Sequence, residues 1–171
     1  PKNNSICSGQ VLFKDYPFDE ALVVVKEMGD DIALQLSRKK KKAAGITLGV
    51  GMAGRSGGGG RHMSYSFPSP TQNDLAFRDM TARLFVSMVG KDEYVRRFMI
   101  SLSGIVDDND PVQLDLFLDN EESKKRESIQ KAILSIKDTY GKNAILKGMD
   151  YEEGATQRER NVQIGGHKSG V

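Results

Sequence analysis

Apolar positions at the start of the chain predict a strand followed by a helix. Residues 10–16 have strand character, and Pro17 suits the first position of a helix that Asp15 or Tyr16 would cap. Gly29 interrupts this helix at some cost in stability. The apolar residues recur at helical spacing and predict one buried face, made of Phe18, Ala21, Leu22, Val25, Met28, Ile32 and Leu36.

Two alternating segments predict a β-hairpin. Apolar and small residues alternate over 46–53, which is the pattern of a half-buried strand with one almost bare face. Residues 62–67 alternate again and predict the returning strand, which we expect Pro68 and Pro70 to end. The connection over 54–61 contains four consecutive glycines, so we expect a flexible hairpin loop.

A second helix and a last strand complete this part of the pattern. Thr71 offers an N-cap with Asp74 three residues later, a variant of the capping box, and the helix should close near Gly90. Its apolar stripe consists of Phe77, Met80, Leu84, Phe85 and Met88. Residues 94–106 then read as a strand. Its buried side carries Phe98, Ile100 and Leu102.

The element order is β-α-β-β-α-β, and the predicted fold class is α+β. We expect one four-stranded antiparallel sheet with two amphipathic helices on one face, followed by a helical C-terminal extension. Small and hydroxylated residues on the other, open face would let a phosphate backbone approach the strand N–H groups. An ordinary solvated sheet face is the alternative. The open face would carry Thr47, Gly49, Gly51, His62, Ser64, Ser66, Arg97, Ser101 and Ser103.

The C-terminal part of the chain predicts one more helix and a polar tail. Residues 123–141 have helical periodicity, with Gly141 as a plausible C-cap. One side of this helix is apolar and consists of Ile129, Ala132, Ile133, Ile136 and Tyr140. We therefore divide the chain into a sheet domain (1–108), an acidic linker (109–122) and a C-terminal helix with its tail (123–171).

The composition indicates a soluble globular protein. With 171 residues, 38% hydrophobic and 28% charged, the chain has room for one well-buried domain and a second small element. No apolar run approaches the roughly 18 residues that a membrane span needs. A single cysteine, Cys7, fits a reducing cytoplasm. The chain begins without a methionine, which suggests a fragment of a longer protein.

The net charge of +2 is unevenly distributed along the chain. Residues 32–73 contain no Asp or Glu but contain Arg55, Arg61 and the basic run 38–42, which we expect at the C-terminal end of the first helix. Residues 98–123 contain acids and no Lys or Arg. This pattern indicates a polyanion-binding surface beside an acidic tether. For 38–42 alone, a solvated helix end is the simpler interpretation.

Residues 113–117, Gln-Leu-Asp-Leu-Phe, follow the acidic stretch and Pro111. Large apolar side chains on a tether suit recognition of a peptide in a groove, in which these side chains fill a pocket and the glutamine amide fixes the orientation. An amphipathic turn folded back on its own domain is the alternative. The pentapeptide resembles the short motif with which bacterial replication and repair proteins dock on the sliding clamp.

The sequence contains no recognisable catalytic or metal-binding pattern. One cysteine and two histidines cannot make a recognisable zinc site, and the glycines at 57–60 are not followed by the Gly-Lys-Ser/Thr of a P-loop. The pairs Asp30-Asp31 and Asp107-Asp108 are best interpreted as solvated charges. We expect no catalytic residue, no metal site and no cofactor in this chain.

Several segments together resemble the C-terminal part of a bacterial Y-family translesion DNA polymerase, of the UmuC/DinB-like UV-damage-repair type. Residues 5–16 are similar to the entry of the family's little finger domain, and 44–51 with 66–71 match its central hairpin. The terminus 158–167 is similar to that of Gram-positive members. Together with the clamp-like pentapeptide, the resemblance covers nearly the whole chain.

This resemblance implies a region that binds and positions DNA without catalysing. The family's catalytic carboxylates and Mg²⁺ ions belong to a palm domain that precedes this part, so DNA-directed DNA polymerase activity is expected only of the full-length enzyme, in the SOS response of a bacterial cytoplasm. The sliding clamp would bind Gln113, Leu114, Asp115, Leu116 and Phe117. Primer–template duplex would be contacted, independently of sequence, by Lys14, Arg55, Arg61, His62, Ser64, Ser66, Arg97, Lys39, Lys40, Lys41 and Lys42.

Two other functions compete with this interpretation. A free-standing sliding-clamp adaptor or inhibitor would use the pentapeptide without binding DNA. A module for single-stranded RNA is less well supported, because the predicted open face lacks paired aromatic residues. DNA affinity with a steep salt dependence would separate the first interpretation from the adaptor.

Overall fold

The computed structural model describes residues 5–109, 120–164 and 167–168. Its main body is a four-stranded antiparallel sheet in the order β1-β4-β2-β3. The strands are β1 (Ile6–Pro17), β2 (Lys41–Met52), β3 (Gly60–Thr71) and β4 (Tyr94–Asp107). The predicted α+β fold is confirmed, with the central strand pair β4 and β2 formed by residues far apart in sequence.

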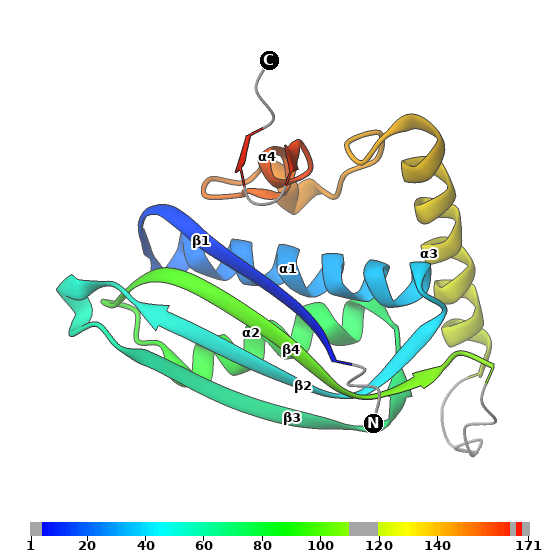
Figure 1. Ribbon diagram of the computed structural model, residues 1–171, viewed down its shortest axis with the longest axis horizontal. Helices are drawn as coiled ribbons and strands as arrows, with labels where there is room; N and C mark the ends of the chain where they lie inside the picture. Colours follow the sequence, from blue (N-terminus) through cyan, green and yellow to red (C-terminus); the bar gives the residue numbers. More distant parts are fainter. Residues whose placement is uncertain (1–4, 110–119, 165–166, 169–171) are drawn as a thin grey trace.

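Helices α1 (Phe18–Arg38) and α2 (Asp74–Met88) both cover the same face of this sheet (Figure 1). They bury its apolar side, including Ile46, Leu48 and Ile100, in one core. Gly29 lies where the helices meet: a Cβ there would lie only 2.7 Å from Thr81 Oγ1 and 3.0 Å from the Phe77 carbonyl oxygen. The helix interruption that the sequence predicts is therefore a point of close packing between helices.

Several element ends differ from the sequence prediction. The chain enters α1 through Pro17 as N-cap, and Asn73, not Thr71, caps α2 by accepting a hydrogen bond from the Ala76 N–H at 3.2 Å. Strand β3 continues through both of its prolines to Thr71. It can do so because it is an edge strand, where a missing N–H need not break a ladder on both sides.

The glycine-rich connection between β2 and β3 forms a defined turn. It begins with the 3₁₀ turn η1 (Gly54–Ser56), and Gly57, Gly58 and Gly59 all adopt positive φ angles of 63–83°. The Ser56 hydroxyl accepts a hydrogen bond from the Tyr94 N–H at 2.7 Å. The expected flexible loop is thus tied to the start of β4, and its glycines serve left-handed backbone conformations.

The basic run 38–42 does not continue the helix. Helix α1 ends at Arg38, and the chain turns through Lys40, at φ 52°, into β2. Lys41 then forms an ion pair with Asp107, and Lys42 pairs with Asp108 at 2.8 Å. The prediction of a basic helix end holds for Arg38 and Lys39 and is wrong for Lys41 and Lys42, which belong to β2. The basic segment neutralises part of the acidic one because β2 and β4 are neighbours.

Beyond the sheet, α3 (Asn120–Tyr140) crosses the C-terminal end of α1, and the last segments lie over the outer side of α1 (Figure 1). These segments are η2 (Gly148–Tyr151), α4 (Gln157–Arg160), β5 (Gln163–Ile164) and β6 (His167–Lys168). Gly141 closes α3 with φ 100°, as predicted. Helix α1 is therefore covered on both sides.

The apolar side predicted for α3 is largely not its packed side. Ile129, Ile136 and Tyr140 are 40%, 36% and 78% exposed. Instead, Gln130 and Leu134 are buried, and the Gln130 amide donates to the Gln72 carbonyl oxygen at 2.7 Å. Helix α3 packs partly through polar groups because the surface that it meets, around the start of α2, offers polar partners.

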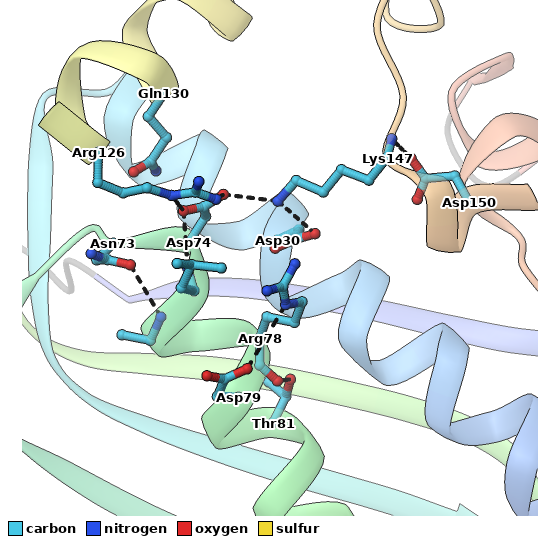
Figure 2. A network of polar contacts seen from close by, with 12 residues as sticks. Asp30, Asn73, Asp74, Arg78, Asp79, Thr81, Arg126, Gln130, Lys147 and Asp150 are labelled. Carbon is cyan, nitrogen blue, oxygen red and sulfur yellow. Dashed lines mark hydrogen bonds and ion pairs between the residues drawn. The ribbon is translucent and has the colours of Figure 1, made fainter.

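A buried charged cluster joins the extension to the helices (Figure 2). Asp74 accepts two hydrogen bonds from the Arg126 guanidinium, at 2.8 and 2.7 Å, and one from Lys147 Nζ at 2.8 Å. Lys147 also pairs with Asp30 at 2.8 Å. Asp30 is only 6% exposed, so its interpretation as a solvated charge is wrong. We call Asp30, Asp74, Arg126 and Lys147 the docking cluster.

The carboxyl groups beneath the extension have shifted pKa values. Burial would raise the pKa of Asp74, but hydrogen bonds from Arg126 and Lys147 outweigh it and hold the pKa at about 2. Burial raises the pKa of Asp30 to about 6 against the opposing effect of Lys147. Glu27 lies nearby on α1, and burial raises its pKa to about 7 although the Thr156 and Gln157 N–H groups donate to it.

Candidate nucleic-acid interface

The face of the sheet opposite α1 and α2 carries small and polar residues in rows across the strands. One row is Cys7, Ser101, Thr47 and Ser64, in the order of the strands. The next places Gly9, Met99, Gly49 and His62 side by side, and the third contains Val11, Arg97, Gly51 and Gly60. Gly45 lies between Ser103 and Ser66 in a fourth row. We call these four rows the open face, and none of their residues is acidic.

Arg97 lies across the bare backbone of Gly51. A Cβ on Gly51 would collide with Cγ of Arg97, whereas a Cβ on Gly49 would meet Met99 Cβ at an ordinary 3.7 Å. Within the described part of the chain, no carboxylate is in ion-pair distance of Arg97. Gly51 thus leaves room for the Arg97 side chain on the open face, where its guanidinium is available to an anionic ligand.

The open face also carries apolar groups that the sequence prediction missed. Val11 is 73% exposed and Met99 58% exposed, and the neighbouring Phe13 is 68% exposed. The signal was present in the alternation, because Leu12 and Phe98 are buried and their neighbours must point the other way. The face therefore combines a polar half, around Thr47 and Ser64, with an apolar half toward β1.

A groove of about 750 Å³ runs along this face. It is lined by Gly9, Gly49, His62, Arg97 and Met99, among others, and the extension contributes Arg160 and Gln163 to its wall. The sequence does not predict that Arg160 and Gln163 line this groove, since residues 160–163 are far from the sheet strands along the chain. Of the predicted DNA contacts, His62 and Arg97 line this groove, and Ser64 and Ser66 lie in other rows of the same face.

Arg61 borders the groove, but its guanidinium is engaged on the helix side, and Arg55 lies outside the groove lining. Arg61 is opposite Val50, which is buried in the core, so its side chain leaves the strand on the helix side. It donates to Glu93 at 2.6 and 2.7 Å and, with the Gly90 N–H, holds the pKa of Glu93 at about 2. Arg55 stacks over the Tyr94 ring at 3.9 Å. A phosphate would have to compete with Glu93 for Arg61.

The remaining predicted cations are also separated from the open-face residues. Lys14 pairs with Glu20 at 3.1 Å. Lys39 and Lys40 form the turn after α1, at the opposite end of β2 from Arg55 and roughly 35 Å away along the strand. The basic residues that the sequence grouped as one surface thus occupy two ends of the sheet. Their contact with DNA stays a prediction.

The predicted clamp motif, Gln113, Leu114, Asp115, Leu116 and Phe117, lies outside the described residues.

Among the residues that are described, no group of three or more His, Cys, Asp or Glu is arranged to hold a metal ion. The docking cluster has two carboxylates, but Arg126 and Lys147 lie 2.7–2.8 Å from them, so two cations already stand where a Mg²⁺ ion would bind. In the same part of the chain, no helix has both the length and the apolarity for a membrane crossing.

Comparison with known proteins agrees with this architecture. UvrX of Bacillus subtilis (strain 168), a protein named for UV-damage repair, is 32% identical over 167 residues, which cover 96% of this chain and 39% of UvrX. The chain therefore spans about two fifths of that relative.

Solved structures of low sequence identity are also similar. One is a complex of the beta-clamp processivity factor with the little finger domain of PolIV, with a TM-score of 0.46 and 12% identity over 67% of this chain and 100% of that chain. Another is a Y-family DNA polymerase chimera of Dbh and Dpo4, with a TM-score of 0.48 and 14% identity over 62% of this chain and 30% of that one. At such scores, neither likeness bears on function.

The family assignment rests on a direct match. Residues 3–116 match the model of the impB/mucB/samB family C-terminal domain. This range contains the whole four-stranded sheet and both helices that cover it. The predicted resemblance to the C-terminal, little-finger part of the UV-damage-repair polymerases is confirmed, and the chain belongs to the impB/mucB/samB family through this C-terminal domain.

Proposed function

We propose that this chain is the DNA-binding, non-catalytic C-terminal region of a translesion DNA polymerase in the bacterial cytoplasm, and that it grips primer–template duplex and docks on the sliding clamp. One observation carries the DNA part of the proposal: a sheet face without a single acidic residue, on which Arg97 lies over a bare glycine. Close approach of a phosphate backbone needs such small residues, and attraction needs the cation.

The hydroxyl groups of the open face suit phosphate oxygens. The Thr47 and Ser64 hydroxyls form a hydrogen bond of 2.8 Å, so the hydroxyl that accepts keeps its own proton for a phosphate oxygen. Hydroxyls and an arginine over bare backbone suit phosphate oxygens, so we expect binding that does not depend on sequence. Val11 and Met99 would cover sugar and backbone carbon atoms.

Salt dependence and one introduced negative charge test the DNA contact. About four phosphate contacts predict a slope of log K against log salt near −3.6, so tripling the salt should weaken binding by tens of fold. Ser64→Glu puts a negative charge in the middle of the open face and should weaken binding at least about tenfold. Ser135→Glu, the same change on exposed α3, is the control. Equal affinity of both variants and the parent protein would contradict the proposal.

Clamp docking is supported by the sequence of residues 113–117 alone. Two apolar anchors on a peptide suggest micromolar affinity, about −8 kcal/mol. Leu116→Ala with Phe117→Ala should cost several kcal/mol, since each side chain loses roughly 1.5–3 kcal/mol of burial. Asp115→Ala should bind the clamp like the parent. Clamp binding without any DNA affinity would favour the free-standing adaptor instead.

We assign nucleotidyl transfer and its Mg²⁺ ions to a catalytic region outside this chain. Transfer at two metal ions needs carboxylates that hold the ions ~3.5–4 Å apart. The buried carboxylates here are engaged by Arg126, Lys147 and backbone N–H groups. Primer extension by this chain with Mg²⁺ and nucleotides would contradict the assignment.

A further inference from the structure

A basic cavity lies where the C-terminal end of α1, the end of α3 and helix α4 meet. Its volume is about 380 Å³, within the range of small-molecule sites. Five cationic side chains line it: Arg38, Lys39, Lys137, Lys142 and Arg160. Only one carboxylate, Asp31, lines it with them, and that carboxylate accepts a hydrogen bond from Gln35 at 3.0 Å. We call this cavity the junction pocket.

Such a concentration of one sign of charge is unusual in a chain whose net charge is only +2. The cations come from three separate elements and the loop after α3, so helical periodicity does not explain their meeting. The α1 dipole favours Arg38 and Lys39 at its C-terminal end, but it does not account for Lys137, Lys142 or Arg160. An anionic ligand in the pocket would relieve the mutual repulsion of these charges.

Of the five cations, only Arg38 forms an ion pair with a described residue, and two of the other four, Lys137 and Arg160, are partly buried. Nη1 of Arg160 is buried, and no acceptor of the described chain lies within hydrogen-bond distance. Lys137 is partly buried and forms no ion pair there, and burial lowers its pKa although Asp150 and Asp31 oppose this effect. By contrast, Arg38 is paired with Asp138 at 2.8 Å. A buried cation without a partner is costly unless a ligand supplies the negative charge.

The neighbouring docking cluster differs, because each of its cations lies beside a carboxylate of the same chain. There, Arg126 and Lys147 meet Asp74 and Asp30 at 2.7–2.8 Å. The junction pocket has the same mixture of Arg and Lys, but its five cations share one lining carboxylate, Asp31, and among the described residues only Arg38 is held in an ion pair. This difference indicates a site for a ligand, because an internal structural cluster would carry its own anions.

We propose that the junction pocket binds a phosphate or diphosphate group. Several cations that approach from different elements suit a tetrahedral group with three or more charged oxygens better than a planar carboxylate, which one arginine can satisfy. The phosphate belongs to a free nucleotide or diphosphate, or to the end of a nucleic-acid strand. Arg160 also lines the groove along the open face, so a strand end could reach the pocket from that groove.

Titration of the isotope-labelled chain with inorganic pyrophosphate tests the proposal. We expect saturable shifts of the backbone amides of residues 137–142 and 157–161. Lys137→Met and Lys142→Met should each weaken binding by about tenfold, as expected for loss of a charged hydrogen bond. Lys142 is exposed, so its replacement does not endanger folding. Lys125→Met removes the same charge from exposed α3 beside Glu121 and Glu122 and should change nothing.

Further probes identify the source of the phosphate. Tighter binding of a 5′-phosphorylated oligonucleotide than of its unphosphorylated form, with the difference lost in Lys142→Met, would assign the pocket to strand ends. Equal binding of both oligonucleotides beside saturable pyrophosphate binding would assign it to free diphosphate groups. Pyrophosphate shifts confined to the open face, equal weakening by Lys125→Met, or preference for a glutamate-rich peptide would each overturn the proposal.

Discussion

The open face of the sheet and the outer side of α1 differ in how their charged groups are paired. On the open face, Arg97 lies over Gly51, no carboxylate of the described residues is in ion-pair distance of it, and the other polar groups are mostly hydroxyls. On the outer side of α1, Asp30 and Asp74 are at most 6% exposed and are held by cations from the extension. The cation of the first surface is open to the partner that we propose, whereas the charges of the second are paired within the chain.

This difference teaches where the chain is available for binding. Charges that are paired and buried mainly fix the position of α3 and residues 147–157, and removing one partner leaves the other costly. A face of small residues contributes little to the free energy of unfolding, but it permits the close approach of a ligand's backbone. We therefore expect changes on the outer side of α1 to act on folding, and changes on the open face to act on DNA affinity.

The largest expected effect is on the docking cluster. Asp74→Ala leaves Arg126 and Lys147 partly buried without their shared anion, so it should lower the free energy of unfolding by about 3–5 kcal/mol. Urea denaturation measures the loss. Asp79→Ala, on an exposed position of the same helix, should stay within about 0.5 kcal/mol. Similar values for both variants would remove the distinction between the two sides.

A pH effect follows from Glu27, whose pKa burial raises to about 7. The folded protein then binds a proton more tightly than the unfolded chain, so stability should fall as the pH rises from about 4.5 to 7. At 1.36 kcal/mol per pKa unit, the loss is up to about 3 kcal/mol. Asp30, raised to about 6, contributes with the same sign.

Urea unfolding at pH 5, 6 and 7 measures this effect. Glu27→Gln should flatten the pH dependence, although it loses part of the acceptor role toward the Thr156 and Gln157 N–H groups and so lowers stability at pH 5. Acid loss of stability below about pH 4 should persist in this variant, since it reflects Asp74. A slope unchanged by Glu27→Gln would assign the titration to another group.

The smallest expected effect sharpens the description of the open face. Arg97→Ala should weaken DNA binding by about threefold to tenfold and flatten the salt slope by about 1. Gly51→Ala should approach this result, because its Cβ displaces Arg97. Gly49→Ala has room for its methyl group and should bind normally. If Gly49→Ala weakens binding as much, the bare backbone itself is the contact. None of the three should alter stability as Asp74→Ala does.

Much of the fold follows from local patterns. Alternation over 46–53 and 62–67 identified the hairpin, and helical spacing identified α1 and α2. The residues of the open face followed from the same alternation, with Val11 and Met99 overlooked. Element ends were less well predicted, as at Pro68 and Pro70, because an edge position is a property of the sheet and not of the segment.

By itself, the sequence determined the strand and helix periods, the family and the small residues of one sheet face, because these depend on neighbours within a few residues. Only the tertiary structure decided which charges are paired. Lys147 meets Asp74 across 73 positions, Arg61 faces Glu93 from the helix side, and α3 packs through Gln130 and Leu134. The physical reason is that burial of a charge depends on a partner from a distant element, and no local pattern records that partner.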